Sequence, residues 1–148
     1  MTTKKTTLAL ALVVALSAAG MASAHFATRH YYSSWTYYPA QSYHYCYYYY
    51  KPTPVVTTYS YHYAIVYPTQ PRYVNYYNPY QQQYWGRLDT QAKGDKQYSL
   101  LAENDRKKEL KDIPEKAFPA LDKMPAIPES TDGEQMLVPK ELPKIDVK

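Results

Sequence analysis

Histidine and cysteine, which can both ligate a metal ion, occur only in the first half of this sequence. His44 and Cys46 are two residues apart, so their side chains share a face if that segment is a β-strand. Imidazole and thiolate are ligands for zinc and copper, and an exported tyrosine-rich chain favours copper. Histidines at the surface among aromatic rings are the competing interpretation. The candidate ligands are His30, His44, Cys46 and His62.

Cys46 is the only cysteine, which excludes a disulfide within the chain. In a secreted protein a lone cysteine suggests a bond between two copies or a free thiol. The alternative is that Cys46 is a small, inert apolar residue within the aromatic cluster.

Catalysis is not indicated by any motif. The sequence has no Gly-rich phosphate loop, nucleophile elbow, paired-cysteine metal motif or His-Glu helix motif. All four histidines precede residue 85 and every Asp and Glu follows it, so a catalytic triad would require the two halves to dock around a pocket. We therefore expect a protein that is not an enzyme and needs no cofactor.

The chain is organised around its tyrosines. Of 20 tyrosines, all but Tyr98 lie within residues 31–84, and residues 31–85 contain no Asp, Glu or Gly. A tyrosine ring is apolar but ends in a hydroxyl that needs a partner when it is buried. We therefore expect these rings to contact something outside the chain. The predicted contact residues are Tyr47, Tyr48, Tyr49, Tyr50, Tyr59, Tyr61 and Tyr63.

The strongest strand pattern covers residues 55–67, which are rich in Val, Thr, Tyr and Ile and end at Pro68. Residues 72–77 suggest a second, short strand. Alternation along the first strand divides its side chains between two faces. One face receives Tyr59, Tyr61, Tyr63, Ile65 and Tyr67, and the other receives His62, Ala64 and Val66.

After Trp85 the composition changes to polar and mixed-charge. Residues 86–97 are expected to form a loop, and residues 99–112 a short helix with Ser99 as its N-cap. Residues 115–118 suggest one more turn. Beyond them recurrent prolines favour an extended strap or disorder, with a turn at Asp132-Gly133.

The N-terminus has the features of a secretory signal peptide. Lys4 and Lys5 precede an uncharged apolar run over residues 8–19, and Ala22-Ser23-Ala24 supplies a cleavage site. The apolar run is shorter than the roughly 20 residues that a membrane span needs. We expect a mature chain that begins at His25, has no membrane span, and is periplasmic, envelope-associated or extracellular.

These patterns predict a mostly irregular, low-order fold. Short β-strands are expected in the Tyr-rich half, one or two short helices around residues 99–118, an extended C-terminus punctuated by proline, and an N-terminal signal helix. The expected segments are the signal peptide 1–24, the Tyr-rich low-complexity segment 25–85 and the polar segment 86–148.

Several short motifs in the second half of the sequence resemble those of other proteins. They include Trp85-Gly86-Arg87, Asp112-Ile113-Pro114-Glu115, Ala117-Phe118-Pro119 and Asp132-Gly133. In this order they resemble the C-terminal part of small secreted bacterial proteins that have no assigned function. The resemblance covers residues 73–139 and implies no activity, cofactor or site.

The charge distribution argues against a nucleic-acid partner. Residues 25–84 contain three cations, which are too few to follow a phosphate backbone, and residues 85–148 contain 12 basic and 13 acidic side chains. We therefore expect a structural or interaction protein that acts through aromatic and strand-edge contacts. Its expected partners are copies of itself, a cell-wall polymer or an envelope protein, and the alternative function is the copper or ligand site described above.

Overall fold

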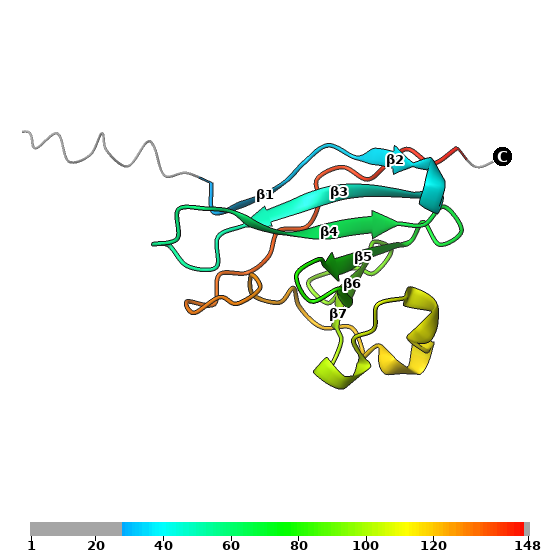
Figure 1. Ribbon diagram of the computed structural model, residues 1–148. Helices are drawn as coiled ribbons and strands as arrows, with labels where there is room; N and C mark the ends of the chain where they lie inside the picture. Colours follow the sequence, from blue (N-terminus) through cyan, green and yellow to red (C-terminus); the bar gives the residue numbers. More distant parts are fainter. Residues whose placement is uncertain (1–27, 147–148) are drawn as a thin grey trace, which may run out of the picture.

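The computed structural model describes residues 28–146, which form one antiparallel β-sheet (Figure 1). The strands lie in the order β1-β3-β4-β5-β6-β7, and β2 pairs with β3 on the same side as β1. Their bounds are β1 His30–Tyr32, β2 Thr36–Tyr38, β3 Tyr43–Tyr50, β4 Ser60–Val66, β5 Tyr73–Asn78, β6 Gln83–Asp89 and β7 Tyr98–Leu100. The predicted signal peptide lies outside the described residues.

Strands β3 and β4 form the longest ladder of the sheet, from His44 opposite Val66 to Tyr50 opposite Ser60. Both strands consist mostly of aromatic and β-branched residues, which fit a pleated surface. Because side chains alternate along a strand, the four consecutive tyrosines at the end of β3 do not act as one block. Two of them point to each face of the sheet.

One face, which we call the covered face, forms the main core. Buried side chains from β3, β4, β5, β6 and β7 meet Ile127 and Met136 from the C-terminal strap, which we define as residues 122–146. The strap runs across the sheet from β7, where Tyr98 pairs with Asp122, to the β1 side, where the Trp35 indole donates to the Glu141 carbonyl over 2.8 Å (Figure 1). The core residues of the sheet are Cys46, Tyr48, Tyr50, Ala64, Val66, Val74, Tyr76, Trp85, Leu88 and Tyr98.

Two buried tyrosines of the covered face have hydroxyl partners. The Tyr76 hydroxyl lies 2.7 Å from that of Tyr32, which in turn donates to the Leu137 carbonyl over 2.6 Å. Tyr48 pairs with Nδ1 of His30 at 2.7 Å. Burial raises the pKa of Tyr48 and Tyr76, so both phenols stay neutral. Paired in this way, tyrosine can fill a core at little hydrogen-bonding cost.

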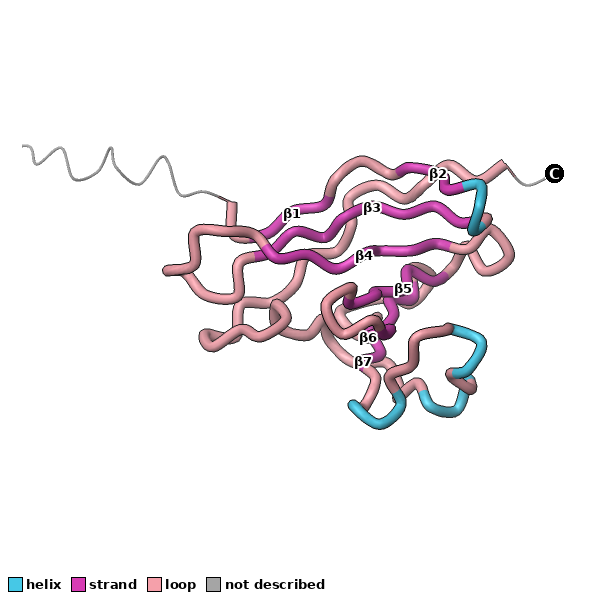
Figure 2. Tube along the Cα trace, viewed as in Figure 1, coloured by secondary structure: helices cyan, strands magenta, loops and turns pink. Residues whose placement is uncertain are grey.

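The opposite face is covered only over its β4–β7 half. Residues 101–118 pack there, with Leu101 and Ile113 against Ile65 and Tyr84. This segment contains three short 3-10 helices, η4 Glu103–Asp105, η5 Leu110–Asp112 and η6 Glu115–Ala117, which Figure 2 shows as isolated turns. Arg87 on β6 anchors the segment through an ion pair with Glu115 and through the Phe118 ring, 3.8 Å from its guanidinium carbon.

Gly86 permits the close pairing of β6 with β7. The register of β5 and β6 shifts between Tyr76 and Tyr77, and Gly86 lies opposite Tyr76. A Cβ at Gly86 would lie 2.7 Å from the Ser99 carbonyl oxygen and 2.8 Å from the Tyr98 ring. Only glycine fits at this position without a shift of β7.

The predicted low-order fold is wrong, because residues 28–146 form a well-ordered sheet. The expectation assigned the rings of the Tyr-rich segment to contacts outside the chain, whereas Tyr48, Tyr50 and Tyr76 are buried in a core that the strap completes. The separate segments 25–85 and 86–148 also contribute to one sheet, and β6 crosses the boundary between them.

The predicted helix over residues 99–112 is also wrong, and the described residues contain no α-helix. Ser99 is buried in β7, where its hydroxyl donates to the Pro119 carbonyl over 2.9 Å instead of capping a helix. Residues 86–89, expected in a loop, belong to β6. Here the burial of Leu88 and Tyr98 in the core outweighs a weak local helix preference.

Other local predictions are confirmed. The short strand at residues 72–77 is β5, and the turn at residues 115–118 is η6. Gly133 has a left-handed φ of 74° in the predicted Asp132-Gly133 turn. The strand predicted over residues 55–67 is present but shorter. It covers Ser60–Val66, and residues 51–59 form a loop.

Candidate functional site

The uncovered half of the second face has a surface of tyrosine rings, which we call the open aromatic face. Its rings come from β1, β2, β3, β4 and the adjoining loops, and none is fully buried, although Tyr43, Tyr45 and Tyr63 pack against the cluster of Ile65, Tyr84, Leu101 and Ile113. They are Tyr31, Tyr38, Tyr43, Tyr45, Tyr47, Tyr49, Tyr59, Tyr61, Tyr63 and Tyr80.

Each ring of this face contacts at least one other, so the surface is continuous. Tyr47 is central: its ring centroid lies 5.2 Å from those of both Tyr61 and Tyr63, on the neighbouring strand. It also stacks on Tyr49 at 5.5 Å with an interplanar angle of 19°. Offset and edge-to-face pairs at these distances stabilise one another by about 0.5–1.5 kcal/mol each. The rings therefore form a pre-arranged surface before any partner is bound.

The open aromatic face is almost free of charge. Strands β1 to β4 contain no Asp, Glu, Lys or Arg, and at one end of the face Lys51 Nζ lies 4.6 Å from the Tyr59 ring centroid. Desolvation, together with neighbouring phenols, raises the pKa of Tyr43, Tyr49 and Tyr63. The face therefore presents neutral phenols, which offer apolar ring surface and hydroxyl groups that donate or accept hydrogen bonds.

A shallow hollow lies on this face between five rings. Tyr38, Tyr43, Tyr45, Tyr47 and Tyr63 enclose a volume of about 160 Å³. Pockets for small molecules usually enclose about 300–1,000 Å³. The hollow is therefore too small for a separate ligand site, and it is better described as relief on a contact surface.

The seven predicted contact tyrosines divide between the two faces. Tyr47, Tyr49, Tyr59, Tyr61 and Tyr63 belong to the open aromatic face, whereas Tyr48 and Tyr50 are buried on the covered face. The sequence analysis did not assign contact roles to Tyr31, Tyr38, Tyr43, Tyr45 and Tyr80. The alternation of side chains along residues 43–50 was enough to place Tyr43 and Tyr45 on the same face as Tyr47. The positions of Tyr31, Tyr38 and Tyr80 depend on strand pairing, which the sequence does not specify.

The candidate metal ligands are held apart from one another. His44 and Cys46 point to the same face of β3, but His44 packs on Tyr37 at 4.9 Å. His62 lies between the Tyr50 and Trp85 rings, each 5.3 Å away, and burial lowers its pKa to about 3. Within residues 28–146, no group of three or more His, Cys, Asp or Glu side chains is placed to hold a metal ion.

Two further predicted residues are buried in the core. His30 bonds to Tyr48, and its Nε2 lies 3.8 Å from Glu134. The Cys46 side chain is 0% exposed, and burial raises the pKa of its thiol to about 12. A protonated thiol beneath the sheet is out of reach of a second copy, so the folded chain does not present Cys46 for a disulfide between molecules.

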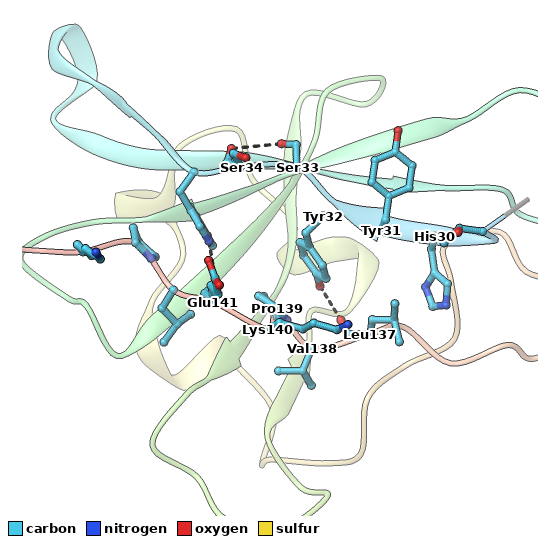
Figure 3. Close-up of a pocket in the computed structure, with 15 residues that line it drawn as sticks. His30, Tyr31, Tyr32, Ser33, Ser34, Leu137, Val138, Pro139, Lys140 and Glu141 are labelled. Carbon is cyan, nitrogen blue, oxygen red and sulfur yellow. Dashed lines mark hydrogen bonds between the residues drawn. The ribbon is translucent and has the colours of Figure 1, made fainter.

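A groove lies between the β1 edge and the strap, and no sequence pattern predicted it. It encloses about 700 Å³ between residues 30–35 and 137–144 (Figure 3). Tyr32 points into it toward the Leu137 carbonyl, while Tyr31 points away from the strap. Among the described strands β1 is terminal in the sheet, so none of them pairs with its outer edge, a type of edge that can pair with an extended segment.

Comparison with known proteins finds no matching family model, curated protein or solved structure. The resemblance of residues 73–139 to small secreted proteins therefore stays a prediction. None of the described residues belongs to a helix with the length and apolar character required to span a membrane.

Proposed function

We propose that this chain is a non-enzymatic interaction protein of the cell exterior, and that the open aromatic face is its contact surface. One observation supports this proposal above the others. The strap packs against one face of the sheet, whereas on the open aromatic face of the other side Tyr43, Tyr45 and Tyr63 pack against the cluster of residues 101–118 and the other seven rings belong to neither buried cluster of the described residues. Large aromatic patches on a protein surface usually mark interaction sites.

The chemistry of the face favours an uncharged polymer as its partner, and we propose a polysaccharide of the cell wall. The apolar faces of sugar rings stack on aromatic rings, and sugar hydroxyls bond to phenol oxygens. The absence of charged side chains from β1 to β4 gives little attraction for a polyanion. Export through the predicted signal peptide would bring the protein to such a polymer.

The outer edge of β1 is a second proposed contact. β1 is short, with three residues, but it contains no charged residue and no proline, so two of the features that normally prevent edge-to-edge pairing are missing. Pairing there would extend the sheet and place two open aromatic faces side by side. In this proposal strand-edge contact builds the array and the rings bind the polymer.

The test is co-sedimentation of the purified protein with insoluble peptidoglycan, chitin and cellulose. A variant with Tyr47→Thr, Tyr61→Thr and Tyr63→Thr keeps strand-forming residues at all three positions but removes the central rings. The matched control is Tyr37→Thr, because Tyr37 is 47% exposed but packs on His44, outside the open aromatic face.

We expect the wild type and the control to sediment with at least one polymer, and the triple variant to stay in solution. Because the contacts are uncharged, binding should change little between low and high salt. Light scattering reports self-association in parallel. A compact monomer that sediments with none of the three polymers would contradict the proposal.

A further inference from the structure

The most closely stacked tyrosines of the open aromatic face lie directly opposite each other at its edge. Tyr31 on β1 pairs with Tyr49 on β3, and their ring centroids are 5.0 Å apart with an interplanar angle of 28°. Most other ring pairs on this face are tilted or edge-to-face, as between Tyr38 and Tyr43 at 74°. Near-parallel rings bring their edges, and thus the carbons next to each hydroxyl, alongside one another.

We propose that Tyr31 and Tyr49 are a site of oxidative coupling, at which a one-electron oxidant of the peroxidase class joins the two rings as dityrosine within one chain. This inference depends on the ring geometry and not on the proposed polymer binding. Coupling would fasten the edge strand β1 covalently to β3 and so fix the border of the open aromatic face.

The reaction balances with hydrogen peroxide as the terminal oxidant. Each phenol loses one electron and its hydroxyl proton, which gives two phenoxyl radicals. A carbon–carbon bond then forms between the ring carbons next to the two oxygens, and the hydrogens on those carbons move to the oxygens as the rings regain aromaticity. The peroxide takes up the two electrons and two protons and leaves as two waters, so the protein loses two hydrogens.

Separation and orientation favour this pair over the more exposed Tyr38 and Tyr80, whose nearest rings on this face lie 5.7 Å away at interplanar angles of 74° and 54°. Tyr31 is 40% exposed, so an oxidant can reach it and its ring has room to rotate toward Tyr49. Tyr47 also stacks on Tyr49, but both belong to one strand and their centroids are 5.5 Å apart.

Other easily oxidised side chains of the described residues lie elsewhere. Cys46, Trp85 and Met136 are buried on the covered face. Trp35 is part of the groove beside the strap, where its indole is hydrogen-bonded to Glu141. An oxidant that reaches the open aromatic face therefore meets only phenols among its accessible groups.

The experiment treats dilute protein with a haem peroxidase and limiting hydrogen peroxide. Dityrosine fluorescence and the intact mass are measured, and the cross-linked peptides are mapped by mass spectrometry. Tyr31→Phe and Tyr49→Phe keep the ring and its packing but cannot form a phenoxyl radical. Tyr37→Phe and Tyr47→Phe are the matched controls, and circular dichroism before oxidation verifies that each variant is folded.

We expect the wild type to yield monomer that has lost two hydrogens, with the cross-link between residues 31 and 49. Tyr31→Phe and Tyr49→Phe should lose most of the intrachain product, while both controls retain it. Three results would overturn the proposal: an unchanged yield in Tyr31→Phe, a cross-link mapped to another pair, or products formed only between chains.

Discussion

Both faces of this sheet are rich in tyrosine, but most of the tyrosines are buried on one face and partly exposed on the other. On β3, Tyr48 is completely buried and hydrogen-bonded to His30, whereas its neighbour Tyr47 is partly exposed among other rings. The difference does not come from the tyrosines, because both have aromatic neighbours. It comes from what covers them: the strap supplies Ile127, Met136 and a carbonyl partner for Tyr32 on one side, whereas residues 101–118 cover only the β4–β7 half of the other and leave Tyr47 outside their cluster. Tyrosine can thus serve as core or as surface within one strand.

The strap is therefore expected to decide whether the sheet is stable. Removing residues 122–148 exposes the covered face and deprives Tyr32 of its acceptor at Leu137. We expect loss of the cooperative unfolding transition, measured by circular dichroism in urea. Leu137→Ser is the control, because this side chain is exposed and should leave the transition in place. A truncated protein that still unfolds sharply would refute the assigned role of the strap.

Truncating one tyrosine on each face should separate the two roles. Tyr76→Ala leaves a cavity in the core and is expected to lower the free energy of unfolding by about 3–5 kcal/mol, as for other buried aromatic residues. Tyr47→Ala removes cross-strand contacts worth roughly 0.2–1 kcal/mol each. Denaturant titration with a constant slope measures both values. Equal losses would mean that the faces are not energetically distinct.

His62 should make the covered face sensitive to acid. Its folded-state pKa is lowered to about 3, whereas in the unfolded chain it titrates near 6.5. The unfolded state therefore binds more protons between these values, and stability present above about pH 6.5 is lost as the pH falls toward 3. Both ring nitrogens lack a hydrogen-bond partner within the described structure, so His62→Leu should be neutral or stabilising at pH 7.

The measurement is the urea midpoint of wild type and His62→Leu between pH 7 and pH 4. The urea midpoint of His62→Leu should exceed that of the wild type by an increasing amount as the pH falls. A constant gap would show that the imidazole is not held neutral in the fold.

Removing single hydroxyl groups gives the smallest effect. Tyr76→Phe deletes the partner of Tyr32 and is expected to cost about 0.5–1.5 kcal/mol, the usual contribution of one hydrogen bond. Tyr47→Phe removes a hydroxyl on a partly exposed ring, where water can take over its hydrogen bonds, and should cost less. Thermal melts of the two variants provide the comparison, and a larger loss for Tyr47→Phe would invert the assignment of the faces.

Part of this division was predictable from local pattern. Alternation correctly placed Tyr61, Tyr63 and Ile65 opposite His62 and Ala64, because a period of two is a property of the strand itself. The same rule applied to residues 43–50 would have separated Tyr47 and Tyr49 from Tyr48 and Tyr50. Reading those four tyrosines as one contact block was the error.

The rest depended on contacts between distant residues. Ile127 and Met136 are single apolar residues among prolines, a pattern that is also typical of a disordered segment. They become part of a core because the sheet provides a surface on which they pack. Ser99 begins a plausible helix locally, but its neighbour Tyr98 pairs with Leu88 in the sheet. Such long-range pairing leaves no short-range signal in one sequence, so the candidate face was identified only in part.

The most direct test of the two-faced sheet is chemical footprinting of its tyrosines, by iodination of the folded protein with and without a bound polysaccharide. We expect Tyr47, Tyr61 and Tyr63 to react in the free protein and to become protected by the polymer, while Tyr48, Tyr76 and Tyr98 stay unreactive in both states. Reaction of the second group in the folded protein, or a bound polymer that leaves the first group fully reactive, would contradict this expectation.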